Sequence, residues 1–296
     1  MARGPITGTL AAAVTPLRGG GDRLDEDALE PLLEFYAAAG LDGLFVLGTT
    51  GEGVLLAPDE RRRLTERVIS GAGGLKIAVH CGAQSTRETM ELAAHAAEAG
   101  ADAVAVIPPP YFAVDDEELT EHLAAAAAAC APLPFYAYEF AARSGYAIPA
   151  AVLGAVGERA GNLVGLKVSD APYDQVAPYL GLGLDVFIGS EPLIAQGLRD
   201  GAVGAVSGLA GAFPELVAEL VRDPTDERTA QVDALRRLVS AERFQASIKV
   251  ALGARGVPVG PDVRRPLRPL SAAAADRLRR QLDQLIGLGL VTGRPA

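Results

Sequence analysis

One lysine of this 296-residue chain stands at the end of an apolar stretch, where another apolar residue would pack. Lys167 follows the sequence Leu-Val-Gly-Leu, and the chain has only two other lysines, Lys76 and Lys249. An ammonium group among apolar neighbours loses hydration, which favours the neutral amine. A neutral amine attacks a ketone to form a Schiff base, and the iminium then withdraws electrons while a C–C bond forms or breaks. The simpler alternative is a lysine that points to solvent or pairs with an acid, here Asp170.

Hydroxyl, phenol and imidazole groups follow several other apolar stretches. These positions are Thr15, Thr49-Thr50, His80-Cys81, Tyr111, Tyr138, Ser190-Glu191 and Ser207. Tyrosine and threonine hydroxyls near a reactive amine relay protons during imine formation. The set lacks the carboxylate and histidine cluster that a divalent metal needs, and His80 and Cys81 would lie on opposite faces of one strand. We therefore expect neither a metal nor an organic cofactor.

Eight short apolar stretches, with helical patterns between them, would position these side chains. They are 7–16, 42–50, 75–82, 102–109, 133–139, 163–169, 185–190 and 201–208. None shows a clean alternation of apolar and polar residues, which is typical of strands buried on both faces of a parallel sheet. Eight alternations of strand and helix predict an α/β protein with a (β/α)8 TIM barrel, whose active site lies at the C-terminal ends of the strands. A doubly wound sheet is the rival, but no Gly-rich phosphate turn follows the first stretch.

The remainder of the chain is predicted to be helical. Helical patterns cover roughly 214–221, 226–252 and 272–286, more than one barrel helix requires. We assign residues 1–210 to the barrel core, and 211–296 to the final barrel helix and a helical C-terminal extension that is not an independent domain. No composition shift marks a linker.

The composition excludes several classes of partner. A hydrophobic content of 49% with 22% charged residues is typical of a globular chain that buries a large core. A net charge of −10 argues against nucleic acid and against anionic membranes, since both attract clustered cations. Two cysteines, Cys81 and Cys130, fit a reducing cytoplasm. The start, MARGPITGTLAAAVTPL, fits a strand better than a signal peptide, and no apolar run reaches the length of a transmembrane helix.

The order and spacing of several motifs resemble the dihydrodipicolinate synthase / N-acetylneuraminate lyase family over nearly the whole chain. The motifs are Ala13-Val14-Thr15-Pro16, GTTGEG (48–53), PPPYF (108–112), YEFAARSG (138–145), GLKVS (165–169) and Gly189-Ser190. Each motif alone is weak, whereas their order is specific. GTTGE can also be interpreted as a phosphate loop, but the Gly-Lys-Ser/Thr of such loops is missing.

The resemblance implies roles for the residues named above. That family forms a Schiff base between pyruvate and a strand-six lysine, so Lys167 would be the nucleophile and Tyr138 the general acid/base. Thr49 would link Tyr138 to a second tyrosine, for which Tyr111 is the candidate; in such enzymes this tyrosine comes from a neighbouring subunit. Thr50 and the adjacent backbone would hold the pyruvate carboxylate. The resemblance also implies a homotetramer, a dimer of dimers.

The second substrate depends on other positions of the predicted pocket. In the synthase branch, an arginine at the place of Arg143 meets the carboxylate of aspartate semialdehyde, so a 4-hydroxy-tetrahydrodipicolinate synthase-like activity on pyruvate and this aldehyde is the expectation. A guanidinium also suits a carboxylate through paired hydrogen bonds. We assign Gly189 and Ser207 to substrate binding as well. The alternatives are a 2-keto-3-deoxy sugar-acid aldolase or dehydratase, and a non-catalytic barrel that binds a keto acid.

Some positions depart from the synthase pattern. The chain has Tyr138-Glu139-Phe140-Ala141 where synthases commonly have Tyr-Asn-Val-Pro, and Pro110-Tyr111-Phe112 where many have Pro-Tyr-Tyr. Arg61 falls where lysine-inhibited synthases can have a histidine. The other two lysines are predicted to be structural: Lys76 at the stability face of the barrel, and Lys249 in a helix.

Overall fold

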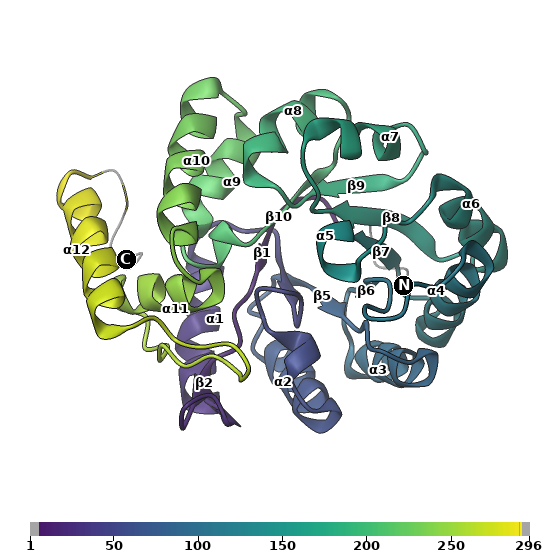
Figure 1. Cartoon of the computed structure of the whole chain (residues 1–296), viewed down its shortest axis with the longest axis horizontal. Helices are drawn as coiled ribbons and strands as arrows, with labels where there is room; N and C mark the ends of the chain where they lie inside the picture. Colours follow the sequence, from purple (N-terminus) through teal and green to yellow (C-terminus); the bar gives the residue numbers. More distant parts are fainter. Residues whose placement is uncertain (1–5, 290, 292–296) are drawn as a thin grey trace.

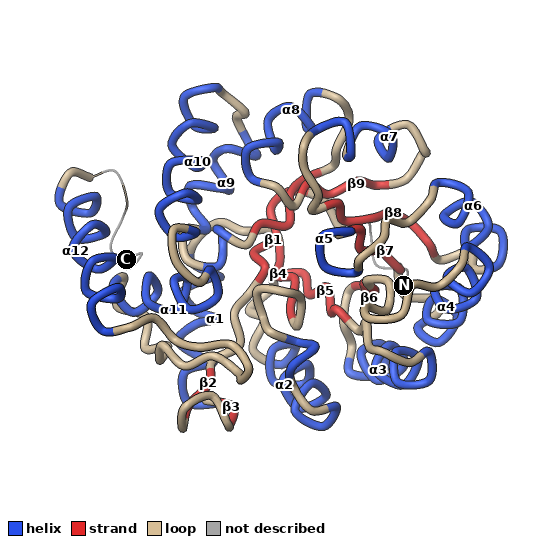
Figure 2. The backbone as a smooth tube through the Cα atoms, viewed as in Figure 1, coloured by secondary structure: helices blue, strands red, loops and turns tan. Residues whose placement is uncertain are grey.

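All eight apolar stretches predicted as strands form one closed parallel sheet in the computed structural model, which describes residues 6–289 and 291. The strands in spatial order are β1 (Gly8–Ala12), β10 (Gly204–Ser207), β9 (Asp185–Ile188), β8 (Leu163–Val168), β7 (Phe135–Glu139), β6 (Ala103–Val106), β5 (Lys76–His80) and β4 (Gly43–Val46). Pairing of β1 with both β10 and β4 closes the ring, which lies at the centre of Figure 2 with helices outside it. The predicted TIM barrel is confirmed.

The barrel strands have apolar side chains on both faces, as their sequences predicted. One cluster fills the inside of the barrel and includes Leu10, Phe45, Ala78, Ala105, Tyr136, Tyr138, Phe187 and Val206. A larger cluster lies between the strands and the surrounding helices and includes their neighbours in sequence, such as Leu44, Val46 and Leu166. Because successive side chains of a strand point to opposite faces, a run without polar gaps supplies both layers at once.

Helices follow the strands around the ring (Figure 1). They are α1 (Leu29–Ala38), α2 (Pro58–Ser70), α3 (Thr86–Ala99), α4 (Asp116–Cys130), α5 (Ala141–Ser144), α6 (Ala150–Arg159), α7 (Ala177–Leu180), α8 (Ile194–Arg199) and α9 (Pro214–Arg222). A small hairpin, β2 (Leu17–Arg18) with β3 (Arg23–Leu24), precedes α1. Helix α3 begins after Ser85, whose hydroxyl caps the first turn by accepting a hydrogen bond from the Glu88 N–H at 3.3 Å.

Three further helices follow α9 at the C-terminal end of the chain. Residues 226–252, predicted as one helix, form two: α10 (Asp226–Ser240) and α11 (Phe244–Ala254). The break at 241–243 allows α11 to turn toward the barrel, where most of its residues are buried. The last helix is α12 (Ala272–Gly287). In the described part of the chain, no helix has the length and apolar character needed to cross a membrane. Residues 1–5, where the segment compared with a signal peptide begins, lie outside the described residues.

The GTTGE turn after β4 is held in a strained shape. Leu47 and Glu52, on either side of the threonines, both have left-handed backbone conformations, with φ of 61° and 58°. Such conformations cost about 1–3 kcal/mol each for residues other than glycine. Gly53 allows the chain to turn back, because a Cβ there would lie 1.8 Å from the Leu47 carbonyl oxygen. Stabilising contacts elsewhere must therefore hold this turn.

A buried ion pair provides those contacts. Lys249 Nζ of α11 lies 2.6 Å from Glu52 Oε1, and both side chains are fully buried. The lysine also donates to the Asp262 carbonyl oxygen at 2.6 Å, and Glu52 Oε2 accepts the Arg264 N–H at 2.6 Å. Burial lowers the pKa of Lys249, while the Glu52 carboxylate opposes that shift. The C-terminal helices thus fix a turn that lies almost 200 residues earlier in the chain.

Removal of the Lys249 charge should strongly destabilise the fold. Lys249→Met leaves Glu52 buried without a counter-ion, so the free energy of unfolding should fall by about 3–5 kcal/mol. The double variant Lys249→Met/Glu52→Gln removes both charges and should recover part of this loss. Urea unfolding followed by circular dichroism measures both effects.

Lys76→Met is the matched control. Lys76 lies 3.2 Å from Asp102, but its side chain is 44% exposed, so the loss should stay below about 1 kcal/mol. If Lys249→Met and Lys76→Met lower the free energy of unfolding by the same amount, the buried pair has no special role in stability.

Candidate active site

Lys167 occupies the C-terminal part of β8, with its amine against two aromatic rings. Lys167 Nζ lies 4.1 Å from the ring centroid of Tyr138 and 4.4 Å from that of Phe45. The side chain is buried, and it borders a small space of about 10 Å³ in the barrel interior, whose other lining residues are mostly apolar. Among the described residues, no carboxylate lies within ion-pair distance of Nζ, and Asp170 instead accepts backbone N–H groups. The ion-pair alternative for Lys167 is therefore wrong.

Tyr138 and Thr49 are joined by a hydrogen bond at the same end of the barrel. The Tyr138 hydroxyl lies 3.1 Å from Thr49 Oγ1, and either oxygen could donate. Gln245 Nε2 of α11 donates to the Thr49 carbonyl oxygen at 3.3 Å, so the C-terminal helices contact this turn a second time. The Phe45 ring meets the Tyr138 ring edge-on at 5.6 Å. The Tyr138 phenol on β7, the Thr49 hydroxyl after β4 and the Lys167 amine on β8 thus lie together at one end of the barrel.

His80 completes the aromatic surroundings of Tyr138. Its ring meets the Tyr138 ring edge-on, with centroids 5.7 Å apart. His80 Nδ1 lies 3.0 Å from the Leu47 carbonyl oxygen, and the Ile107 N–H approaches Nε2 at 3.4 Å. These contacts fit a neutral ring that donates from Nδ1 and accepts at Nε2. Burial, followed by the Arg61 guanidinium, lowers the pKa of His80 to about 3.

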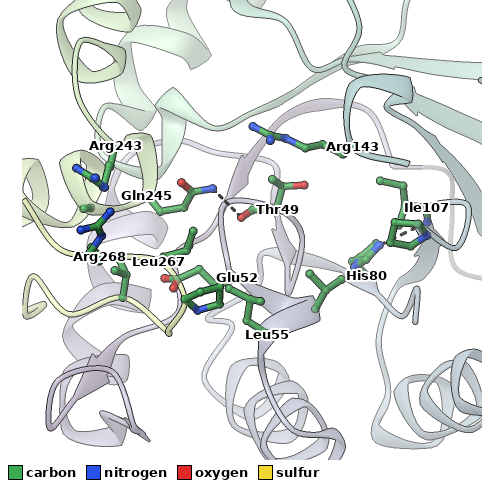
Figure 3. Close-up of a pocket in the computed structure, with 15 residues that line it drawn as sticks. Thr49, Glu52, Leu55, His80, Ile107, Arg143, Arg243, Gln245, Leu267 and Arg268 are labelled. Carbon is green, nitrogen blue, oxygen red and sulfur yellow. Dashed lines mark hydrogen bonds between the residues drawn. The ribbon is translucent and has the colours of Figure 1, made fainter. Parts of the chain in front are cut away.

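A cavity of about 490 Å³ opens above this group (Figure 3). Thr49, Glu52 and His80 line its floor, and Gln245 and Leu267 bring in the C-terminal part of the chain. Lys167 and Tyr138 do not line the cavity, whereas Thr49, the hydrogen-bond partner of Tyr138, does. Three arginines also line it: Arg143 of α5, Arg243 at the start of α11, and Arg268. In Figure 3, Arg243 and Arg268 lie at the end away from His80 and Ile107.

Comparison with known proteins assigns this barrel to a family. The profile of the dihydrodipicolinate synthetase family matches residues 5–285. The chain belongs to this family. An uncharacterized DapA-like lyase of Halobacterium salinarum is 36% identical over 284 residues, 91% of this chain and 90% of the relative. The 4-hydroxy-tetrahydrodipicolinate synthase of Methanothrix thermoacetophila is 30% identical over 292 residues, 95% and 97% of the two chains. The crystal structure of YagE from E. coli K12, in complex with pyruvate, is 26% identical with a TM-score of 0.88 and coverage of 94% and 98%.

Within this dihydrodipicolinate synthetase family barrel, the other predicted site residues are placed as follows. Thr50 is buried and packs closely against Gly208, because a Cβ added to that glycine would lie 3.2 Å from Thr50 Oγ1. Gly189 packs against Ser169, whose Oγ would lie 2.1 Å from an added Cβ. Ser207 is buried away from the cavity, where its hydroxyl donates to Glu191 Oε1 at 2.7 Å and accepts the Ala210 N–H at 3.1 Å. A substrate role for Ser207 gains no support from this geometry.

Tyr111 is not joined to Thr49 and Tyr138 within one chain. Its side chain is 87% exposed, and Phe112, 73% exposed, packs edge-on against it at 4.9 Å. The backbone of Tyr111 is left-handed, with φ of 87°. The predicted relay through Tyr111 therefore requires a second copy of the chain.

Several residues of the site were not identified from the sequence. Phe45 lies against the Lys167 amine on the inner face of β4, and the uniformly apolar sequence of that strand gave no sign of which face it would occupy. Gln245, Arg243 and Arg268 reach the cavity from the C-terminal part, and no sequence signal linked them to the barrel mouth. In the described residues, no group of three or more His, Cys, Asp or Glu side chains could hold a metal ion.

His80 should remain neutral through the physiological pH range. Because its pKa is lowered to about 3, its imidazole nitrogens should show the neutral Nδ1–H tautomer with no titration between pH 5 and pH 8. ¹⁵N NMR of the three histidines, with His80→Asn to assign the signal, measures this. A midpoint near pH 6.5 would contradict the buried, hydrogen-bonded ring.

Proposed function

We propose that this chain is a pyruvate-dependent lyase that forms a Schiff base on Lys167 and joins pyruvate to aspartate semialdehyde, as 4-hydroxy-tetrahydrodipicolinate synthases do. One observation carries the proposal: the only amine at this end of the described barrel interior lies 4.1 Å from the ring of Tyr138, whose hydroxyl is 3.1 Å from Thr49. Family membership and the similarity to the pyruvate-bound YagE structure support the same reaction class.

The chemistry assigns one step to each group. Lys167 Nζ attacks C2 of pyruvate, and the resulting carbinolamine loses its hydroxyl as water to leave an iminium. Tyr138 donates the proton that turns the departing hydroxyl into water, and Thr49 holds the phenol in place. The Tyr138 phenolate then takes a proton from C3 to give an enamine, which attacks the aldehyde carbon while the phenol returns this proton to the aldehyde oxygen. Attack of water on the remaining iminium releases the product and restores the Lys167 amine and the Tyr138 phenol.

The acceptor aldehyde is proposed to carry a carboxylate. Arg143 lines the cavity with its guanidinium 5.6 Å from the Phe140 ring, and Arg243 and Arg268 line the same cavity. Within residues 6–289 and 291, no acidic side chain forms an ion pair with any of the three, so each is available to a ligand. An arginine binds a carboxylate through paired charge-assisted hydrogen bonds.

A sugar-acid substrate is the second candidate. The Glu139-Phe140-Ala141 sequence before Arg143 differs from the synthase pattern, and this departure favours a 2-keto-3-deoxy sugar-acid aldolase or dehydratase. We also propose that the enzyme is a cytoplasmic homotetramer, in which Tyr111 of one chain reaches Thr49 of another. Two features of Tyr111 support such a role: the residue is 87% exposed, and its backbone has the strained left-handed conformation.

Borohydride reduction with pyruvate should leave a covalent adduct on Lys167. Mass spectrometry of tryptic peptides should find the adduct in the wild type and none in Lys167→Arg, because a guanidinium forms no Schiff base under these conditions. Lys76→Arg is the control and should retain the adduct. If no 2-keto acid leaves an adduct on the wild type, the lyase proposal fails.

A screen of acceptor aldehydes with pyruvate should identify the second substrate. Arg143→Ala should raise the KM for aspartate semialdehyde about 10- to 100-fold, the value expected when a charge-assisted hydrogen bond of about 1.5–3 kcal/mol is lost. Arg87→Ala, at an exposed position of α3, is the control and should leave the KM unchanged. Consumption of a sugar aldehyde with no activity on aspartate semialdehyde would favour the sugar-acid alternative.

A further inference from the structure

Two buried carboxyl groups lie behind the helix that carries Arg143. Glu139 is the last residue of β7, and Asp170 follows β8; their side chains are 1% and 6% exposed. In the described residues, neither forms an ion pair with a cation. Carboxylates are seldom buried without a positive partner, because the loss of hydration is costly. The pair therefore needs another explanation, and the proposed reaction uses neither group.

Both carboxyl groups bind the backbone of the segment that includes Arg143. They share the Ala141 N–H, which lies 3.1 Å from Glu139 Oε1 and 2.8 Å from Asp170 Oδ2. Asp170 Oδ1 accepts the Ala142 N–H at 3.3 Å, and Glu139 Oε2 accepts the Ile148 N–H at 2.5 Å. The pair thus binds both ends of a stretch from Phe140 to Ile148, with Arg143 between them.

The charge state of the pair follows from its surroundings. Burial, followed by the hydrogen bond to Asp170, raises the pKa of Glu139 to about 8. The other titratable group that faces the pair is Tyr179 of α7; burial raises the pKa of its phenol, which stays neutral and donates to the Ile148 carbonyl oxygen at 2.9 Å. The Arg143 guanidinium lies against Phe140 and supplies no counter-charge. With its pKa near 8, Glu139 is mostly protonated at neutral pH.

We propose that Glu139 and Asp170 share one proton and act together as positioning residues, which hold the 140–148 segment in the conformation that presents Arg143 to the cavity. The shared proton removes the repulsion between two carboxylates that bind the same N–H. Loss of the proton leaves two buried negative charges side by side, so the segment should open and Arg143 should leave the cavity wall. The role in acceptor binding rests on the function proposed above, whereas the role in holding the segment does not.

Hydrogen exchange tests the positioning role without any substrate. Peptides that cover residues 140–148 should lose protection about tenfold between pH 7 and pH 9 in the wild type, after correction for intrinsic exchange rates, since the ionised fraction changes by about that factor around a pKa near 8. Glu139→Gln keeps an acceptor for the Ile148 N–H, donates an amide to Asp170 and cannot ionise. It should stay protected at pH 9.

Two further variants keep this test decisive. Asp170→Asn removes the other charge and should abolish the pH effect in the same way, which covers the case in which Glu139→Gln does not fold. Glu158→Gln, the same substitution at an exposed position of α6, should behave as the wild type. Equal loss of protection in the wild type, Glu139→Gln and Asp170→Asn would overturn the proposal.

Steady-state kinetics then separates positioning from a purely structural role. Between pH 7 and pH 9, the KM for the carboxylate-bearing acceptor should rise several-fold in the wild type and stay constant in Glu139→Gln, while the rate of pyruvate trapping on Lys167 should have the same pH profile in both. Identical KM profiles would overturn the link to Arg143. Absence of any pyruvate adduct would refute the proposed function instead, and the exchange result would stand.

Discussion

The buried ion pair between Glu52 and Lys249 is the constraint on which the site depends. It joins the turn after the second barrel strand to α11, and it holds Glu52 in a left-handed conformation that a non-glycine residue rarely adopts. Thr49 lies in the same turn, and its hydrogen bond to Tyr138 exists only while that turn keeps its shape. The C-terminal helices therefore help to orient the hydroxyls of Thr49 and Tyr138.

The position of the Lys167 amine depends in turn on the apolar side chains that fill the barrel interior. Phe45, Tyr136 and Phe187 fill the space beneath the amine and exclude water from below. The same aromatic layer fixes Tyr138, whose ring contacts Phe45, His80 and Phe140. A fold that packs large side chains in layers inside the barrel thus gives Lys167 a buried position at the strand ends, between the rings of Phe45 and Tyr138.

Substrate selection would come from the other side of the cavity. Arg143 is carried by α5, a helix of four residues that has little stability of its own. Its shape depends on Glu139 and Asp170, two carboxyl groups that accept the first N–H groups of α5, which have no partner within the helix itself. Sequence changes at these buried positions would therefore alter specificity without any contact to substrate.

The barrel, its eight strands and the grouping of Lys167, Tyr138 and Thr49 could all be predicted before any coordinates were known. Buried parallel strands and the hydroxyls at their ends are local patterns, and such patterns are visible in the chain as runs of apolar residues and as the order of motifs. The tertiary structure was needed to show which distant residues meet: Lys249 with Glu52, Gln245 with Thr49, and Asp170 with Ala141 rather than with Lys167. It also divided the predicted 226–252 helix into two. Such pairings depend on the path of the chain in space, because a lysine or a glutamate in a helical or strand pattern gives no sign of its partner.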